Sequence, residues 1–282
     1  MRREAQRTLY SLSSLYQRQV ESDEYQVIVI DNGSDLPLSK DTVESFGPNF
    51  EYHYFDTESA SPAEAVNYGA SLASGELFAC IVDGARMLSP GLIKYSLIAG
   101  RAFNKPFIAS LAWHLGPNEQ NISMQEGYDQ AAEDKLLETI DWKSDGYQLF
   151  DVATQASSSR VGFLGGMPEE LSYFAMHKSL FLNMGGFCED FQSPGGGLVN
   201  HDFLHRALTI DNLDIVMLLG EGSFHQIHGG VATNVKPEDH PFGSFAKEYQ
   251  KVRETEFELL VQPEGLAISY LGSIHKAALR FI

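Results

Sequence analysis

The chain has 282 residues, 43% of them hydrophobic, and a net charge of −18, so it is long enough for one large α/β domain or two small ones. Proteins that bind nucleic acids or anionic membranes usually carry basic surface patches. Such an acidic chain is therefore a poor candidate for binding either of them. No apolar run approaches the ~20 residues that span a bilayer. The first residues, MRRE, are not followed by the apolar core expected of a signal peptide. We therefore expect a cytoplasmic protein without a transmembrane segment, in which Cys80 and Cys188 are buried free thiols.

The first third of the chain is predicted to alternate helices and strands, which is typical of α/β folds. Apolar residues at spacings of three and four predict a helix over residues 2–20. Runs rich in β-branched and aromatic residues predict strands over 25–30, 50–55, 79–82 and 107–113. Helices are expected over 40–46, 61–74 and 90–103. Because of its length and apolar character, the strand at 79–82 is expected to be buried in a parallel sheet.

Asp83 stands at the carboxyl end of this strand, where ligands bind in open α/β sheets. A carboxylate at this place either holds a divalent metal against a phosphate or caps a following helix. His225 and His228 lie three residues apart beside a pair of glycines, which suits a metal or an anionic ligand. Histidines also occur in loops without such a role, so the pair alone leaves both interpretations open.

Residues 114–170 differ from their surroundings because glycine, serine, asparagine and acidic residues dominate there. Two short apolar patches, at 131–140 and 147–152, predict helical turns inside this stretch. A long irregular segment within an α/β domain is usually functional or mobile, and we expect an insert that faces the substrate. Further on, residues 215–219 are predicted to form a strand and residues 242–256 a helix.

Four segments resemble, in order, the motifs of family 2 glycosyltransferases, which have the GT-A fold. They are VIVIDNGS at 27–34, AVNYG at 65–69 with ASGE at 73–76, IVD at 81–83, and GGF at 185–187 followed by DFLHR at 202–206. The resemblance covers about residues 2–220. It implies a mostly parallel, Rossmann-like sheet flanked by helices in one domain, 1–234. This domain would comprise a nucleotide-sugar half (1–113), an acceptor-side insert (114–170) and an acceptor and catalytic half (171–234), followed by a helical extension (235–282).

The resemblance also implies roles for individual residues toward a nucleotide-sugar. Asp31, with its neighbour Asn32, would contact the nucleoside, and Asn67 would line the donor pocket. Asp83 would hold Mn²⁺ or Mg²⁺ against the diphosphate, and such a metal neutralises the leaving nucleoside diphosphate. His225 or His228 would complete the metal shell or bind the pyrophosphate.

The sequence departs from the family pattern at three places. Ala85 replaces the second acid of the D-x-D motif, and we hypothesise that Arg86 or the histidines take over part of its role, since arginine binds diphosphate bidentately. Asn200 stands in the segment where the family has its general base, so Asp202 becomes the nearest acidic candidate. The family's first strand is absent before residue 1, and either the chain starts late or another segment fills that position.

The leading functional hypothesis is an inverting, metal-assisted glycosyltransferase, hexosyltransferase-like, acting in polysaccharide biosynthesis. Its donor would be a UDP-, GDP- or dTDP-sugar and its acceptor a hydroxyl of a saccharide or related molecule. The alternative is a GT-A-like nucleotide-sugar binding or assembly module with weakened or lost catalysis, which Ala85, Asn200 and the absent strand favour. The histidine pair favours the enzyme.

Overall fold

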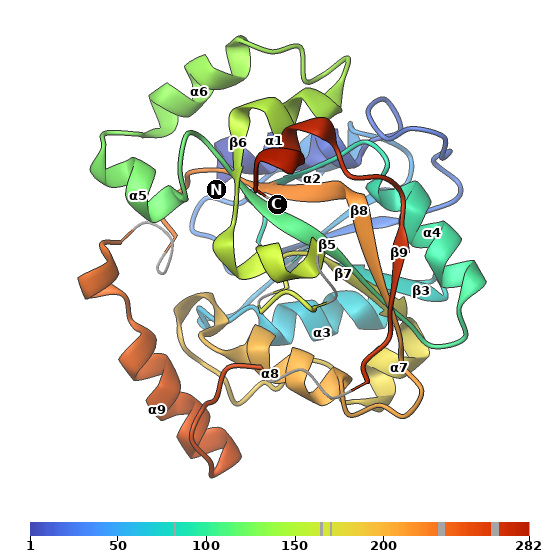
Figure 1. The fold of residues 1–282 in the computed structure, drawn as a ribbon, viewed down its shortest axis with the longest axis vertical. Coiled ribbons are helices and arrows are strands. Elements are labelled where there is room, and N and C mark those ends of the chain that lie inside the picture. Colours follow the sequence, from blue (N-terminus) through green and yellow to red (C-terminus); the bar gives the residue numbers. More distant parts are fainter. Residues whose placement is uncertain (82, 164–165, 170, 231–234, 261–264, 282) are drawn as a thin grey trace.

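The computed structural model describes residues 1–281 except 82, 164–165, 170, 231–234 and 261–264. Helices lie on both sides of a central sheet, and a smaller pair of strands stands apart from it in the hydrogen-bonding pattern (Figure 1). Val82, part of the strand predicted over 79–82, lies outside the described residues. The α/β, GT-A type fold expected from the sequence is confirmed.

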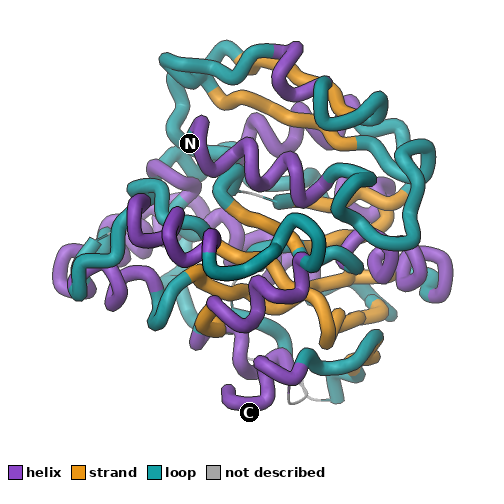
Figure 2. The backbone as a smooth tube through the Cα atoms, turned by 90° about the horizontal axis from the view of Figure 1, so that it is seen from above, coloured by secondary structure: helices purple, strands orange, loops and turns teal. Residues whose placement is uncertain are grey.

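The smaller sheet pairs β1 (Val27–Asn32) with β2 (Phe50–Phe55) in parallel, and Figure 2 shows it at one edge of the molecule. Helix α2 (Lys40–Glu44) connects the two strands, and Ser39 caps its first turn by accepting a hydrogen bond from the Thr42 amide. Two further helices, α1 (Arg2–Leu12) and α3 (Ala63–Leu72), pack against this smaller sheet. Helix α3 approaches β1 at Gly69, where a Cβ atom would lie only 3.1 Å from Ile30.

The central sheet has the strand order β3-β7-β5-β8-β4, with β6 added to β5 and β9 to β8. The strands are β3 (Leu77–Cys80), β4 (Arg86–Leu88), β5 (Pro106–Leu115), β6 (Ala153–Gln155), β7 (Phe174–His177), β8 (Asp214–His225) and β9 (Ile268–Leu271). The sheet is mixed: β8 is parallel to β5 and β9, whereas the β3–β7, β5–β7, β5–β6 and β4–β8 pairs are antiparallel. The strand before Asp83 was therefore wrongly predicted to be parallel to its neighbour, because β7, from the second half of the chain, lies beside it.

Alternate residues of the central strands face two different cores, as the period of a strand requires. Phe107 is in register with Met176 and Ile215, and all three belong to the larger core. Helices α7 (Lys178–Asn183) and α8 (Val199–Ala207) contribute Phe181 and Phe203 to the same core. The next residue along β5, Ile108, faces a second core against α4 (Leu92–Ala102).

Two regions contain more regular structure than the sequence predicts. The insert 114–170 contains helices α5 (Gln120–Gln125) and α6 (Gln130–Glu138), the 3-10 turns η1 (Gly146–Val152) and η2 (Ser157–Phe163), and β6, which joins β5. The extension 235–282 contains η4 (Pro237–Asp239), α9 (Phe242–Arg253) and η5 (Lys276–Phe281), and a further 3-10 turn, η3 (Pro194–Gly196), lies before α8. The extension was predicted to be helical, but its strand β9 lies along β8 and completes the sheet there.

Other predictions need smaller corrections. The helix predicted over 2–20 ends at Leu12, because Ser13 adopts an extended conformation. Cys80 is a buried free thiol, as expected, whereas Cys188 is a free thiol that is partly exposed. Within the described parts of the chain, no helix combines the length and apolarity needed to cross a bilayer.

Replacement of Phe203 by alanine tests the larger core. The ring is fully buried among Phe174, Phe181 and Phe187, with ring centroids 4.7–5.5 Å away. Loss of this ring leaves a cavity, so Phe203→Ala should lower the free energy of unfolding in urea by about 3–5 kcal/mol. The same change at the exposed Phe242 is the control and should cost at most ~0.5 kcal/mol. Equal losses in both variants would show that the ring cluster is not a core.

Candidate metal centre

Asp83 lies in the short connection between β3 and β4, where its carboxylate is oriented by the local backbone. Its Oδ1 accepts a hydrogen bond of 2.9 Å from the Ala85 amide, which leaves Oδ2 free to face other segments. The Ala85 side chain is fully buried. A second carboxylate at position 85 would therefore face the interior, and the site must obtain its other polar groups elsewhere.

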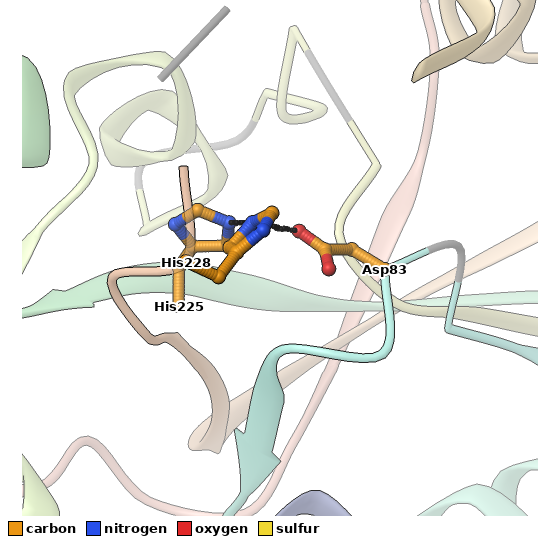
Figure 3. Close-up of side chains that lie close together, drawn as sticks. All are labelled: Asp83, His225 and His228. Atoms are coloured by element: carbon orange, nitrogen blue, oxygen red, sulfur yellow. Dashed lines mark hydrogen bonds and ion pairs between the residues drawn. The ribbon is translucent and has the colours of Figure 1, made fainter. Parts of the chain in front are cut away.

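The histidines meet Asp83 because β4 pairs with the end of β8. In this antiparallel pair Arg86 stands opposite His225, the last residue of β8. His225 Nε2 lies 2.8 Å from Asp83 Oδ2, and His228 Nε2 lies 3.2 Å from the same oxygen. The two imidazole nitrogens are 3.1 Å apart, so the three atoms form a small triangle (Figure 3). The structure thus brings together the three residues that the sequence predicts as metal ligands.

The protonation states expected at neutral pH suit a metal. Burial alone would raise the pKa of Asp83, but hydrogen bonds from His225 and His228 outweigh it and hold this pKa well below the ordinary value. Burial and the nearby Arg86 lower the pKa of His225, so its imidazole is neutral. Neutral imidazole and ionised carboxylate are the forms that coordinate metals.

The triangle also has the size that a metal requires. Its edges of 2.8, 3.1 and 3.2 Å match the spacing of about 3 Å between neighbouring ligands of an octahedral ion with bonds of ~2.1 Å. A neutral imidazole carries only one N–H, so the three contacts cannot all be hydrogen bonds at once. A cation could be bound by lone pairs of all three atoms together. The residues present therefore fit a divalent metal.

Arg86 adds a positive charge to this site. Its side chain shares a face of the β4–β8 pair with His225, because directly opposed residues in a ladder point the same way. It is half-buried and forms no hydrogen bond or ion pair with any other described residue. A guanidinium in this position can bind an anion next to a metal.

Comparisons with known proteins connect this geometry to a family. Residues 2–84, which end just after Asp83, match the family described as "Glycosyl transferase family 2". This N-terminal part of the chain is similar to family 2 glycosyltransferases. S. aureus TarS has a similar fold, with a TM-score of 0.50 and 14% identity over 80% of this chain and 34% of that one. This chain thus spans about a third of that structure's length.

Two other solved structures were found with lower similarity. S. aureus TarS 1–349 gives a TM-score of 0.47 at 15% identity over 88% of this chain and 62% of that one. S. aureus TarS 1–349 in complex with UDP gives 0.46 at 15% identity over 78% and 56%. No protein with curated information matches the sequence significantly.

The predicted nucleoside-binding residues lie at the carboxyl end of β1. Asp31 accepts hydrogen bonds from the Ser34 amide and the Tyr52 hydroxyl, both at 3.1 Å. Asn32 donates to the carbonyl oxygens of Ser59 and Ser61, at 3.2 and 3.0 Å. The buried Oδ1 of Asn32 has no hydrogen-bond partner among the described residues. Both residues shape this strand end, and none of these contacts involves Asp83.

The side chain of Asn67, the third residue predicted to bind the sugar donor, forms hydrogen bonds with a distant part of the chain. Its Oδ1 accepts from the Phe187 amide and its Nδ2 donates to the Phe187 carbonyl, both at 2.9 Å. Nδ2 also donates to Glu189 at 2.8 Å. These bonds join α3 to the glycine turn at 185–187, where Gly186 has a positive φ of 62°. The contacts of Asn67 favour a structural role over donor binding.

The side chains of Asp202 and Asn200, the predicted catalytic residues, also form hydrogen bonds within the protein. The Asp202 side chain is 2% exposed, and its oxygens accept hydrogen bonds from Arg253, at 2.5 and 2.7 Å, and from Arg206, at 2.9 Å. Asn200 donates to the Leu171 carbonyl at 2.5 Å. Both carboxylate oxygens are thus occupied by arginine N–H groups rather than turned toward an acceptor. The geometry favours Asp202 as the ion-pair centre that joins α8 to α9.

Sequence reasoning missed Glu133, a fully buried carboxylate on α6. Its Oε2 accepts a 2.8 Å hydrogen bond from the Ile227 amide, inside the turn between the two histidines. Its Oε1 accepts from Arg3 on α1 at 2.7 Å. An acidic residue on the buried side of a predicted amphipathic helix is the signal that could have identified it.

Replacement of Asp202 by asparagine tests its structural role. The variant keeps the shape but leaves Arg206 and Arg253 without their charged partner, so the free energy of unfolding should fall by up to ~3 kcal/mol. Amide hydrogen exchange in α9 should accelerate more than in α4, because α9 loses its anchor. Asp211→Asn, at an exposed carboxylate after α8, should change neither measurement. Unchanged stability and exchange in Asp202→Asn would contradict the structural role.

Proposed function

We propose that the domain transfers a sugar from a nucleotide-diphosphate-sugar to a hydroxyl of a saccharide or related acceptor, with inversion at the anomeric carbon. The convergence of Asp83, His225 and His228 beside Arg86, which has no hydrogen-bond or ion-pair partner among the described residues, is the observation that carries the proposal. A diphosphate leaving group needs positive charge where negative charge develops. Here a metal position and a guanidinium lie side by side, within a domain of glycosyltransferase fold.

Asp83, His225 and His228 would hold the divalent ion, which supplies positive charge to the departing diphosphate when bound. Two imidazoles and only one carboxylate make a donor set that is less suited to Mg²⁺ than to a transition metal. We therefore propose Mn²⁺ rather than Mg²⁺. The hydrogen bond from Ala85 fixes Asp83 so that Oδ2 faces the histidines.

Arg86 would bind the diphosphate oxygens through its planar pair of N–H groups. Among the described ligands the site has one carboxylate, so a divalent ion and Arg86 together would leave it positively charged and able to take an anion. Asp31 and Asn32 are proposed to contact the nucleoside, since they stand at the carboxyl end of β1, where ligands bind in open α/β sheets.

A second function, a nucleotide-sugar binding module without transfer activity, is favoured by one observation. The predicted base Asp202 is held by two arginines, and Asn200 has no acidic group. Both functions require the donor site, and only the first requires a base that deprotonates the acceptor. Release of nucleoside diphosphate from a nucleotide-sugar distinguishes the two functions, because a binding module without transfer activity would release no nucleoside diphosphate.

Donor binding and cleavage form the direct test of the proposed function. A nucleotide at 100 times its dissociation constant stabilises a protein by about 2.7 kcal/mol, so one of UDP, GDP or dTDP should raise the melting temperature by roughly 5–10 °C with Mn²⁺. The corresponding nucleotide-sugar should then release nucleoside diphosphate, with or without acceptor. A shift without release would support the binding module, and no shift with any nucleotide would contradict both functions.

Replacement of Asp83 by asparagine tests the metal. Loss of the one carboxylate among the three described candidate ligands should weaken Mn²⁺ binding by more than the ~10–100-fold that a supporting residue costs, as measured by the electron paramagnetic resonance signal of free Mn²⁺. The exposed Asp23→Asn provides the control for the same chemical change and should bind Mn²⁺ like the unchanged chain. Equal affinity in Asp83→Asn would exclude Asp83 as a ligand.

Arg86→Ala should weaken nucleotide binding in the presence of Mn²⁺ by about 10-fold or more, since a charge-assisted hydrogen bond contributes ~1.5–3 kcal/mol. Isothermal titration with the nucleotide found by thermal shift is the measurement. Affinity for Mn²⁺ alone should not fall, because Arg86 is not a ligand. Arg101→Ala, at an exposed arginine of α4, is the control. Unchanged nucleotide affinity in Arg86→Ala would rule out its contact with the diphosphate.

A further inference from the structure

Helix α1 turns a buried polar face toward the metal centre. Glu4, Thr8 and Ser11 are at most 5% exposed, and spacings of four and three residues place them on one side of the helix. Polar groups buried in this way need hydrogen-bond partners. Their partners therefore show which segments of the chain this helix holds in place.

The Thr8 hydroxyl joins the two segments that carry the metal-ligating residues. Its Oγ1 donates to the Gly84 carbonyl at 2.7 Å and accepts from the Gln226 side-chain amide at 3.3 Å. A hydroxyl can do both because it has one hydrogen and two lone pairs. Gly84 follows Asp83 and Gln226 follows His225, so a single side chain bridges positions 142 residues apart in the sequence.

Gln226 completes this connection from the other strand. Its backbone amide donates to the Ala85 carbonyl at 2.8 Å, and its Nε2 donates to the Glu4 carbonyl at 3.1 Å. The side chain is fully buried. Because the Ala85 amide in turn donates to Asp83 Oδ1, a continuous chain of hydrogen bonds runs from α1 to the carboxylate.

Different helices hold the two sides of the metal centre: α6 contacts the turn that carries the histidines, and α1 contacts the connection that carries Asp83. Glu133 holds the histidine turn from α6 by accepting from the Ile227 amide. On the Asp83 side, Thr8 is the α1 side chain that binds the connection between β3 and β4 at Gly84. Ser11 accepts from the Leu88 amide at 3.0 Å, at the far end of β4. Loss of the Thr8 hydroxyl should therefore release Asp83 relative to the histidines and leave the turn itself in place.

We propose that Thr8 is a positioning residue for the metal centre, which fixes the distance between Asp83 and the two histidines by bridging Gly84 and Gln226. The inference rests on the proposed function, since it assumes that these three residues bind a divalent ion. Supporting residues that orient metal ligands typically contribute 10–100-fold to metal affinity. A hydroxyl that only filled space in α1 would contribute nothing to metal affinity.

The test compares Mn²⁺ affinity, by the resonance signal of free Mn²⁺, with the melting temperature in the same set of variants. Thr8→Val keeps the shape and removes the hydroxyl, and it should weaken Mn²⁺ binding by about 10-fold. Thr8→Ser keeps the hydroxyl and should restore the affinity. Ser11→Ala removes an equally buried hydroxyl from the same helix and should lower the melting temperature without changing Mn²⁺ affinity.

The outcomes separate this inference from the proposed function. If the unchanged chain binds no Mn²⁺, the proposed function fails and the inference fails with it. If the unchanged chain and Thr8→Val bind Mn²⁺ equally, or if Ser11→Ala loses as much affinity, only the inference is overturned. Should Thr8→Val fail to fold, Gln226→Met removes the other half of the bridge. It should weaken Mn²⁺ binding to a similar extent, and unchanged affinity there would overturn the inference.

Discussion

Three polar atoms, Asp83 Oδ2, His225 Nε2 and His228 Nε2, lie within 3.2 Å of one another although they come from distant segments. The lone pairs of the half-buried Asp83 carboxylate need partners, which hydrogen bonds from the imidazoles or a bound cation can supply. Burial and Arg86 disfavour protonation of His225. The pairing of β4 with β8 creates this arrangement, and the surrounding contacts of α1 and α6 are consistent with the need to maintain it.

Much of the fold and part of the site could be predicted from residue types and their spacing. Periodicity located the strands over 50–55 and 107–113 and the helices of the first third, because local burial patterns determine them. Asp83 and the two histidines could be identified because chemically active residues stood at predicted strand ends or beside glycines. These signals are local, and the structure brings those three residues together as expected.

Other expectations depended on partners that no local pattern reveals. Asp202 has the chemistry of a base, but Arg253, 51 residues away, occupies its carboxylate. Asn67 is a polar residue inside α3 that could reach a ligand, yet it binds the backbone of Phe187, 120 residues away. The antiparallel neighbour of β3 and the addition of β9 to the sheet are likewise long-range events. Residue type defines what a side chain can do, whereas tertiary contacts determine which of these roles remains possible.

The central claim is that Asp83, His225 and His228 bind one divalent ion. The most direct measurement is anomalous X-ray diffraction, at the manganese absorption edge, from crystals of the chain grown with Mn²⁺. We expect one strong anomalous peak within ~2.0–2.4 Å of Asp83 Oδ2 and of both histidine Nε2 atoms, the range of metal–oxygen and metal–nitrogen bonds in proteins. Crystals that contain Mn²⁺ but show no peak between these residues would contradict it.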